Sequence, residues 1–223
     1  MTESVRIFAD PICVDCWLTY RWLREVDQLR PLDLRVHGYS MRLRREDILP
    51  PEPLARRDAS LGLLRIMEAV RDRYGEPSVR RVYEAFEVCV QHERVSVTDL
   101  HLAEILAVLD LDPAMIAAAS DPLWDRPIKA RMRECAAAYG TDLAKVPVPV
   151  LVFEDGTALA GPGWSTPPEG ADALRAYDAV RALAAIPQFV EVMRPGQEDD
   201  PLDALPLWAP ATVRTPHLCG ECR

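Results

Sequence analysis

Long apolar runs are absent from this sequence. No run approaches the roughly 18 to 20 hydrophobic residues that a membrane-spanning helix needs. The N-terminal stretch MTESVRIFADP leads directly into a strand-like run and contains no hydrophobic core of a signal peptide. We therefore expect a cytoplasmic protein that has no membrane partner.

The sequence also lacks an excess of positive charge. Lysine and arginine together number 26 against 35 aspartates and glutamates, which gives a formal net charge of -9. Lysine itself is rare and occurs only as Lys129 and Lys145. A protein that binds nucleic acid needs a basic face to neutralise phosphates. We therefore expect no nucleic-acid partner.

The remaining composition is that of an ordinary globular protein. Of the 223 residues, 49% are hydrophobic and 27% are charged. This length is enough for one sizeable domain, or for one domain with a second inserted into it. In a reducing compartment six cysteines seldom form a disulfide framework, and closely spaced pairs favour redox or metal chemistry.

The N-terminal part of the chain predicts a strand, a helix and a second strand. Residues 5–10 are rich in β-branched and aromatic side chains, and Pro11 ends this short strand. After Cys13 the apolar residues recur at roughly helical spacing. Residues 32–41 then begin with alternating leucine and valine and predict the second strand.

From about residue 44 to residue 140 the pattern changes to that of helices. A second helix of this block is expected to begin at Thr98, a favourable N-cap. A third is expected at Asp121, with Pro122 in its first position and a kink at Pro127. The first apolar stripe, at helical spacing, consists of Val79, Val82, Tyr83, Phe86 and Val90.

β-structure is predicted again after this helical block. Residues 148–153 and 157–161 flank Glu154-Asp155-Gly156, a hairpin signal, and a closing helix follows. Strand, helix, strand, hairpin and helix is a thioredoxin-like order. The predicted division is a thioredoxin-like domain made of residues 1–43 and 143–193, an inserted helical subdomain of residues 44–142, and an irregular tail of residues 194–223.

The spacing of Cys13 and Cys16 places both sulfurs at the first turn of a helix. A thiol at a helix N-terminus has its thiolate stabilised by the helix dipole and by free backbone N–H groups. Cys13 could then attack a substrate and Cys16 could resolve the adduct. Half of a zinc site has the same spacing, so the pair alone leaves both alternatives open.

Pro149 stands at the start of a predicted strand, where its missing N–H removes a ladder hydrogen bond. A cis Val148–Pro149 bond would explain its presence and would leave the Val148 backbone free to pair with an extended substrate. A trans proline at a sheet edge is the alternative. The presence of Pro149 at this position, together with the cysteine pair, favours the redox interpretation of the cysteines.

Three stretches of the chain resemble a known family. They are FADPICVDCWLTYRW, VPVPVLVFEDGTALAGPGWSTPPEGADALRAYDAV and IPQFVEVMR. Through them the sequence is similar to the DsbA family, in the cytoplasmic branch that includes the mycothiol-dependent nitroreductases of actinobacteria. The resemblance implies an α/β thioredoxin-like fold with an inserted all-helical subdomain. It also implies that Cys13 is the nucleophile, Cys16 the resolving thiol, Pro149 the cis-proline and mycothiol the low-molecular-weight thiol.

The dipeptide between the cysteines departs from that family, which carries Pro-Trp there. This chain has Val14-Asp15 instead. A carboxylate close to Cys13 opposes formation of the thiolate and should make the dithiol less oxidising. Dithiol chemistry is therefore a firmer expectation than nitroreductase activity.

The tail carries a second pair of cysteines, Cys219 and Cys222, outside the family match. With Cys13 and Cys16 they could form a tetrahedral zinc site or bind copper(I). They could instead act as auxiliary thiols that reduce a Cys13–Cys16 disulfide from a tethered tail. A disordered end with unused thiols is the third alternative.

These observations predict an enzyme that catalyses thiol–disulfide exchange, of DsbA type, or the mycothiol-dependent reduction of a small molecule such as a nitro compound. We expect no bound cofactor or metal, a low-molecular-weight thiol as co-substrate and, as a further partner, a thiol reductase protein. Val148, Pro149 and Trp17 are the predicted substrate-binding residues. The rival functions are a metal-binding protein that uses both cysteine pairs, and a pathway-specific isomerase or oxidoreductase of natural-product biosynthesis.

Overall fold

A mixed sheet of four strands, in the order β2–β1–β3–β4, forms the centre of the molecule. The computed structural model describes residues 2–44, 51–93, 95–96 and 101–191. Strand β1 (Glu3–Ala9) pairs in parallel with β2 (Leu32–Gly38) and antiparallel with β3 (Val150–Phe153). Strand β4 (Ala158–Ala160) pairs antiparallel with β3 at the sheet edge.

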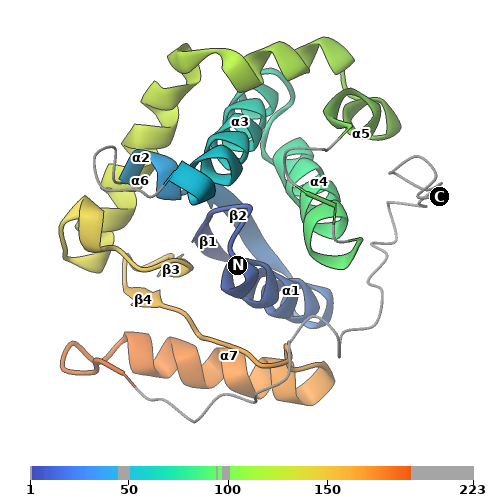
Figure 1. Ribbon diagram of the computed structural model, residues 1–223. Coiled ribbons are helices and arrows are strands. Elements are labelled where there is room, and N and C mark those ends of the chain that lie inside the picture. The colour runs from blue at the N-terminus through green and yellow to red at the C-terminus, as the bar shows by residue number, and fades with distance from the viewer. Residues whose placement is uncertain (1, 45–50, 94, 97–100, 192–223) are drawn as a thin grey trace.

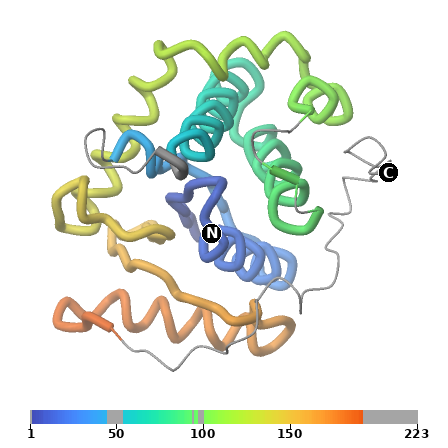
Figure 2. The backbone as a smooth tube through the Cα atoms, viewed as in Figure 1, coloured from blue at the N-terminus to red at the C-terminus, as the bar shows by residue number. Residues whose placement is uncertain are grey.

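Helices supply the rest of the described structure, and most of them lie between β2 and β3 in the chain. Figures 1 and 2 show the chain leaving the sheet after β2, passing through this group of helices and returning at β3. The α-helices are α1 (Val14–Leu29), α2 (Met41–Arg44), α3 (Pro51–Tyr74), α4 (Glu76–Glu87), α5 (Leu102–Val108), α6 (Asp125–Tyr139) and α7 (Gly170–Ala184). A π-helical turn, η1 (Val88–His92), and three 3-10 segments, η3 (Pro113–Ser120), η4 (Pro122–Trp124) and η5 (Leu143–Lys145), complete the set.

Helices α6 and α7 cover opposite faces of the sheet. Successive side chains of a strand point to opposite faces, and Val5 lies opposite Phe153 in the sheet. The Phe153 ring meets Tyr177 of α7 at a centroid distance of 6.2 Å. Arg6, the next residue of β1, forms an ion pair with Glu134 of α6. Each face of the sheet is therefore covered by a helix. The face under α6 also carries charged side chains, Arg6 and its neighbour Arg35, which is exposed.

Helix α1 lies on the α7 side of the sheet, and its Trp22 packs against α7. The Trp22 indole Nε1 donates a hydrogen bond to the Ala173 carbonyl oxygen at 3.0 Å. Its ring also packs at 6.0 Å from Tyr177. Trp22 is completely buried, so this tryptophan belongs to the core.

A buried polar network holds α4 against α1. Tyr20 Oη donates to Glu84 Oε1 at 2.5 Å, and Arg24 Nε lies 2.8 Å from the same oxygen. Arg80 and Asp27 form a second ion pair between the two helices at 2.8 Å. Because Glu84 is buried and has both partners, its charge is compensated rather than orphaned. The helical insertion is thus fixed to the helix that begins at the cysteine pair.

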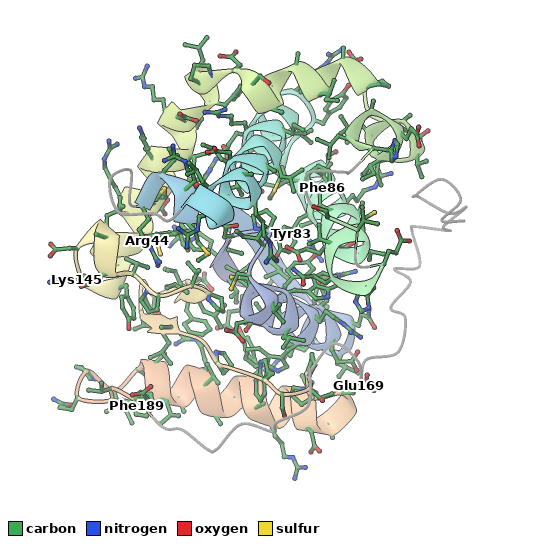
Figure 3. All side chains as sticks on the ribbon, in the orientation of Figure 1. Arg44, Tyr83, Phe86, Lys145, Glu169 and Phe189 are labelled. Atoms are coloured by element: carbon green, nitrogen blue, oxygen red, sulfur yellow. The ribbon has the colours of Figure 1, made fainter. Side chains whose placement is uncertain are left out.

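The apolar stripe predicted within the insertion is buried as expected. Val79, Val82, Tyr83 and Phe86 are all completely buried, and Figure 3 shows Tyr83 and Phe86 on the side of α4 that faces the centre of the molecule. Val90 is half-buried and lies in the π-helical turn.

The predicted helix boundaries are partly different in the structure. Thr98 lies outside the described residues, and the described helix begins at Leu102. Asp121 caps a short 3-10 segment and accepts a hydrogen bond from Leu123 N at 2.9 Å. Pro127 stands in the first turn of α6. A kink is not required there, because the first N–H groups of a helix have no intrahelical partner.

The hairpin between β3 and β4 forms where the sequence predicts it. Gly156 adopts a positive φ of 84°, which glycine tolerates better than other residues. Asp155 accepts a hydrogen bond from Thr157 N at 3.0 Å. The strands of the sheet come from both parts of the predicted thioredoxin-like domain, while its exact boundaries stay a prediction.

No helix in the described ranges combines the length and apolar character that crossing a membrane would require.

A buried histidine on β2 faces a group of arginines. His37 lies opposite Phe8 in the sheet, and its ring packs edge-on against that phenylalanine at 5.1 Å. Burial, and then the nearby charges of Arg131 and Arg71, lower the pKa of His37 to about 2. The imidazole is therefore neutral in the folded protein and charged in the unfolded chain below its ordinary pKa.

We predict that His37→Leu makes the protein less sensitive to acid. Because the folded-state pKa of His37 is lowered, the unfolded chain takes up a proton as the pH falls through about 6.5, and folding stability is lost. His37 lowers the free energy of unfolding by about 2 kcal/mol between about pH 7 and about pH 5. Urea unfolding of both proteins at the two pH values measures the difference. Replacement of the exposed His101 is the control, and an equal acid sensitivity of the wild type and His37→Leu would contradict the assignment.

Candidate active site

The two N-terminal cysteines occupy the first turn of α1. Cys13 is the N-cap residue of this helix, with an extended backbone at φ -96° and ψ 111°. The turn is closed by hydrogen bonds from Cys13 N to Asp10 O at 3.0 Å and from Trp17 N to Cys13 O at 3.2 Å. Cys13 is half-buried, Cys16 is completely buried, and both are free thiols. One sulfur is therefore accessible from outside and the other lies behind it.

The surroundings shift the pKa values of the two thiols in opposite directions. A hydrogen bond from the Cys16 side chain lowers the pKa of Cys13, and the Cys16 backbone N–H adds to this effect. Burial, together with the nearby carboxylates of Asp15 and Asp10, offsets part of the lowering. Burial raises the pKa of Cys16 well above its ordinary value, and the Cys13 sulfur raises it further. In this geometry Cys13 ionises at a lower pH than Cys16, which keeps its proton longer.

The Val148–Pro149 segment lies directly beside Cys13. The peptide bond between these residues is cis, as predicted from the sequence. Cys13 Sγ and the Val148 carbonyl oxygen are 3.9 Å apart. Pro149 stands immediately before β3, and its own carbonyl oxygen accepts a hydrogen bond from Gly161 N at 2.8 Å. The fold thus brings together two segments that are 135 residues apart in the chain.

Trp17, a predicted substrate-binding residue, lies in the core of the protein. Its side chain is completely buried, and its indole Nε1 donates to His92 Nε2 at 3.1 Å. The ring stacks on Tyr20 at 5.9 Å. Trp17 joins the active-site helix to the π-helical turn η1, and in this conformation it presents no surface to a ligand.

Asp10 is a buried carboxyl beneath the cysteine turn that the sequence analysis did not single out. Its oxygens accept hydrogen bonds from Ile12 N at 3.1 Å, from Met41 N at 2.6 Å and from Ser60 Oγ at 2.5 Å. Burial raises the pKa of Asp10, and these three hydrogen bonds compensate only in part. Asp10 therefore joins the turn before Cys13 to the start of α2 and to the third turn of α3.

Glu87 is a second buried carboxyl that the sequence analysis missed. Among the described residues neither of its oxygens has a hydrogen-bond partner of good geometry, although the side chains of Gln91 and Tyr83 interact with it. Burial raises its pKa well above the ordinary value, and the nearby Cys13 and Asp10 raise it further. Gln91 Nε2 in turn contacts the Pro11 carbonyl oxygen at 3.4 Å. The end of α4 therefore lies against the cysteine turn.

The other buried carboxyls of the described chain differ from Glu87 in having good partners. Glu84 is held by Tyr20 and Arg24, and Glu68 is paired with Arg71 and Arg131. An ionised carboxylate without such partners is very costly to bury. The helical insertion thus keeps a protonated carboxylic acid close to the dithiol.

The predicted metal site would combine Cys13 and Cys16 with Cys219 and Cys222 of the tail. Within the described ranges no group of three or more His, Cys, Asp and Glu side chains is placed to hold a metal ion. Cys219 and Cys222 lie outside those ranges, so their roles as auxiliary thiols or metal ligands stay predictions. A cavity of about 360 Å³ lies between α2, α3 and α6, and none of the predicted site residues lines it.

Comparison with known proteins agrees with this arrangement. A family model described as Rv2466c-like, mycothiol-dependent nitroreductase Rv2466c, matches residues 12–194. A crystal structure described as that of "a putative protein disulfide isomerase from Nitrosomonas europaea" resembles the chain with a TM-score of 0.52 and 15% sequence identity. That likeness covers 83% of this chain and 100% of the other, and it shows a DsbA-like thioredoxin fold with inserted helices. Because the family model spans most of the sequence, the chain belongs to the Rv2466c-like family of mycothiol-dependent nitroreductases, and its chemistry is that of a thiol-dependent oxidoreductase.

Proposed function

We propose that this protein is a dithiol oxidoreductase in which Cys13 is the nucleophile and Cys16 the resolving thiol. The observation that carries the proposal is the opposite shift of the two pKa values within one helical turn. The accessible sulfur is the one that is stabilised as a thiolate, and the thiolate is the nucleophilic form of cysteine. Burial raises the pKa of Cys16, so this thiol stays protonated until it attacks the mixed disulfide on Cys13.

The first step is attack of the Cys13 thiolate on a sulfur of a disulfide substrate. A bond forms between Cys13 Sγ and that sulfur, and the other half of the substrate leaves as a thiolate that takes up a proton. The Val148 carbonyl, 3.9 Å from Cys13 Sγ, is the backbone group beside which an extended substrate would pair. We assign Val148 and Pro149 to substrate binding on this ground.

The second step resolves the mixed disulfide. Cys16 loses its proton and attacks Cys13 Sγ, which expels the remaining half of the substrate as a thiolate. Two electrons have then passed from the dithiol to the substrate, and Cys13 and Cys16 are joined by a disulfide. A low-molecular-weight thiol, which the family identifies as mycothiol, attacks this disulfide and forms a mixed disulfide with the protein. A second molecule of the thiol then attacks the mixed disulfide, leaves with the first as their symmetric disulfide, and restores the reduced protein.

Reduction of nitro compounds is a more specific activity that we propose for the same dithiol. It rests on the family alone, while the Val14-Asp15 dipeptide differs from the pattern of that branch. The negative charge of Asp15 opposes the Cys13 thiolate, so the chain is expected to be a weaker oxidant than a relative without a carboxylate at that position. Exchange with disulfides is therefore the activity to test first.

We predict that Cys13→Ser, in a chain that also carries Cys219→Ser and Cys222→Ser, reduces thiol–disulfide exchange to the background rate, because the three cysteines that remain in the described chain are buried. Cys16→Ser should instead accumulate a mixed disulfide on Cys13, because the resolving thiol is lost. Intact-protein mass spectrometry after alkylation, in a chain that also carries Cys219→Ser and Cys222→Ser, detects the adduct without interference from the tail.

Cys135→Ala is the matched control for these substitutions. This thiol is buried in α6, where burial raises its pKa to about 12, and it should be inert. Its loss should leave the exchange rate unchanged. Full activity of Cys13→Ser would show that the assigned nucleophile is wrong.

We predict that Glu87→Gln becomes progressively more stable than the wild type as the pH rises. The folded-state pKa of Glu87 is raised, so its contribution to stability is present below its unfolded pKa and is lost as the pH increases. The wild type loses stability between the unfolded pKa and the raised folded-state pKa of Glu87, by at most about 1.4 kcal/mol per pH unit. Denaturant unfolding between about pH 5 and about pH 8 measures it, with Glu104→Gln on the exposed face of α5 as the control. A constant stability difference would contradict a buried neutral carboxyl.

A further inference from the structure

The arginines of α2 and α3 fall into two groups. Some are neutralised by carboxylates: Arg42 Nε lies 2.6 Å from Asp58 Oδ1, and Arg65 Nε lies 2.7 Å from Asp125 Oδ1. Arg44 and Arg56 form no ion pair with any carboxylate in the described parts of the chain. Arg57 of α3 also has no carboxylate partner in the described chain, and its Nη1 is buried without a hydrogen bond there. Arg44 and Arg56 differ from it in contacting the backbone on either side of the cysteine turn.

Arg56 reaches the turn immediately before Cys13. Its Nη2 contacts the Ile12 carbonyl oxygen at 3.4 Å, and its side chain is exposed. Ser60, one helical turn further along α3, is held to Asp10 at 2.5 Å. Because residues four apart lie on the same side of a helix, these two contacts orient the start of α3 along the cysteine turn. Within the described residues this contact is the hydrogen bond that Arg56 forms, and its other N–H groups lie on an exposed side chain.

Arg44 reaches the segment on the other side of Cys13. Its Nη1 donates to the Val146 carbonyl oxygen at 2.9 Å, two residues before the Val148 carbonyl that lies beside Cys13 Sγ. Its Nε is buried and has no hydrogen-bond partner among the described residues. The positive charge of Arg44 also acts on Asp10 beneath the turn. Figure 3 shows Arg44 at the end of α2, on the same side of the molecule as Lys145.

Both guanidinium groups are thus anchored to the backbone segments that flank Cys13. Guanidinium N–H groups form strong, geometrically specific hydrogen bonds with carboxylates and phosphates. Lys145 is less suited to this task, because it is paired with Asp142 at 3.4 Å. On the helix side of Cys13 the exposed Asp15 carboxylate repels an anion, so a negatively charged substrate is directed toward the arginines.

We propose that Arg44 and Arg56 bind an anionic group on the disulfide or electrophile that Cys13 attacks. The preferred substrate then carries a carboxylate, or a group of the same charge, within a few bonds of its reacting sulfur. This inference rests on the proposed role of Cys13, and it assigns to the helical insertion the selection of substrate charge. The reaction itself is unchanged: the Cys13–substrate bond forms, the substrate S–S bond breaks, and the leaving thiolate takes up a proton.

Two small disulfides of different charge test the proposal, in a chain and in variants that all carry Cys219→Ser and Cys222→Ser, so that the tail thiols do not react. Dithiobis(nitrobenzoate) carries a carboxylate on each ring, whereas dithiodipyridine is neutral, and both release a coloured thiol when Cys13 attacks them. The measured quantity is the ratio of their second-order rate constants, divided by the same ratio for a free thiol. This ratio cancels any change in the reactivity of Cys13 itself, because such a change affects both probes.

We predict that Arg44→Gln and Arg56→Gln each lower this ratio by about threefold to tenfold, as expected for a charge-assisted hydrogen bond that is partly exposed. Arg44→Lys and Arg56→Lys should retain part of the preference, because they keep the charge. Asp15→Asn should raise the ratio. Arg175→Gln, an exposed charge on α7, is the matched control and should leave it unchanged.

Salt gives a second measurement that needs no variant. Raising the ionic strength from about 0.1 M to about 1 M shortens the Debye length from about 10 Å to about 3 Å, and the wild-type ratio should fall toward that of a free thiol. A ratio that neither the arginine substitutions nor salt alters would overturn the anion site. Loss of reaction with both probes in Cys13→Ser, together with an unaltered ratio in the arginine variants, would retain the proposed function and reject this inference alone.

Discussion

The hydrogen bond between the Cys16 thiol and the Cys13 sulfur is the interaction on which the proposed chemistry depends. It lowers the pKa of Cys13 more than any other contact does, and it does so against burial and against two carboxylates. Its strength comes from the position of both residues in the first turn of α1, where the Cys16 backbone N–H also points to Cys13. A helix that began one residue later would separate these groups.

The helical insertion places that turn in a closed environment. Glu84 and Arg80 hold α4 on α1 through ion pairs, His92 holds Trp17, and Ser60 holds Asp10. These contacts fix the insertion along α1, place the buried Asp10 and Glu87 near Cys13, and leave Cys13 only half-buried. The sheet and α7 provide the opposite support through Trp22. The inserted helices therefore control the electrostatics of the site as well as its access.

Local patterns predicted the elements that carry the cysteines, but not the partners that those elements meet. The strand, turn and helix around Cys13, the hairpin at Gly156 and the proline beside Val148 follow from residues close together in the sequence. Asp10 and Ser60 are 50 residues apart, and Trp17 and His92 are 75 residues apart. Such pairs depend on how α3 and α4 pack, which no periodicity reveals. The sequence predicts Trp17 as a substrate-binding residue, whereas the structure buries it against His92 and Tyr20. The apolar ring of a tryptophan fits a core and a binding groove equally well, so the sequence does not distinguish them.

The most direct test of this account is a titration of the Cys13 thiolate by its ultraviolet absorbance, in a chain that carries Cys219→Ser and Cys222→Ser. The account predicts that Cys13 ionises below the ordinary pKa of a cysteine, and that Cys16→Ala raises this pKa because the hydrogen-bond donor is removed. The same pKa in both proteins, or a Cys13 that ionises only at the ordinary value, would contradict the central role of the Cys16–Cys13 hydrogen bond.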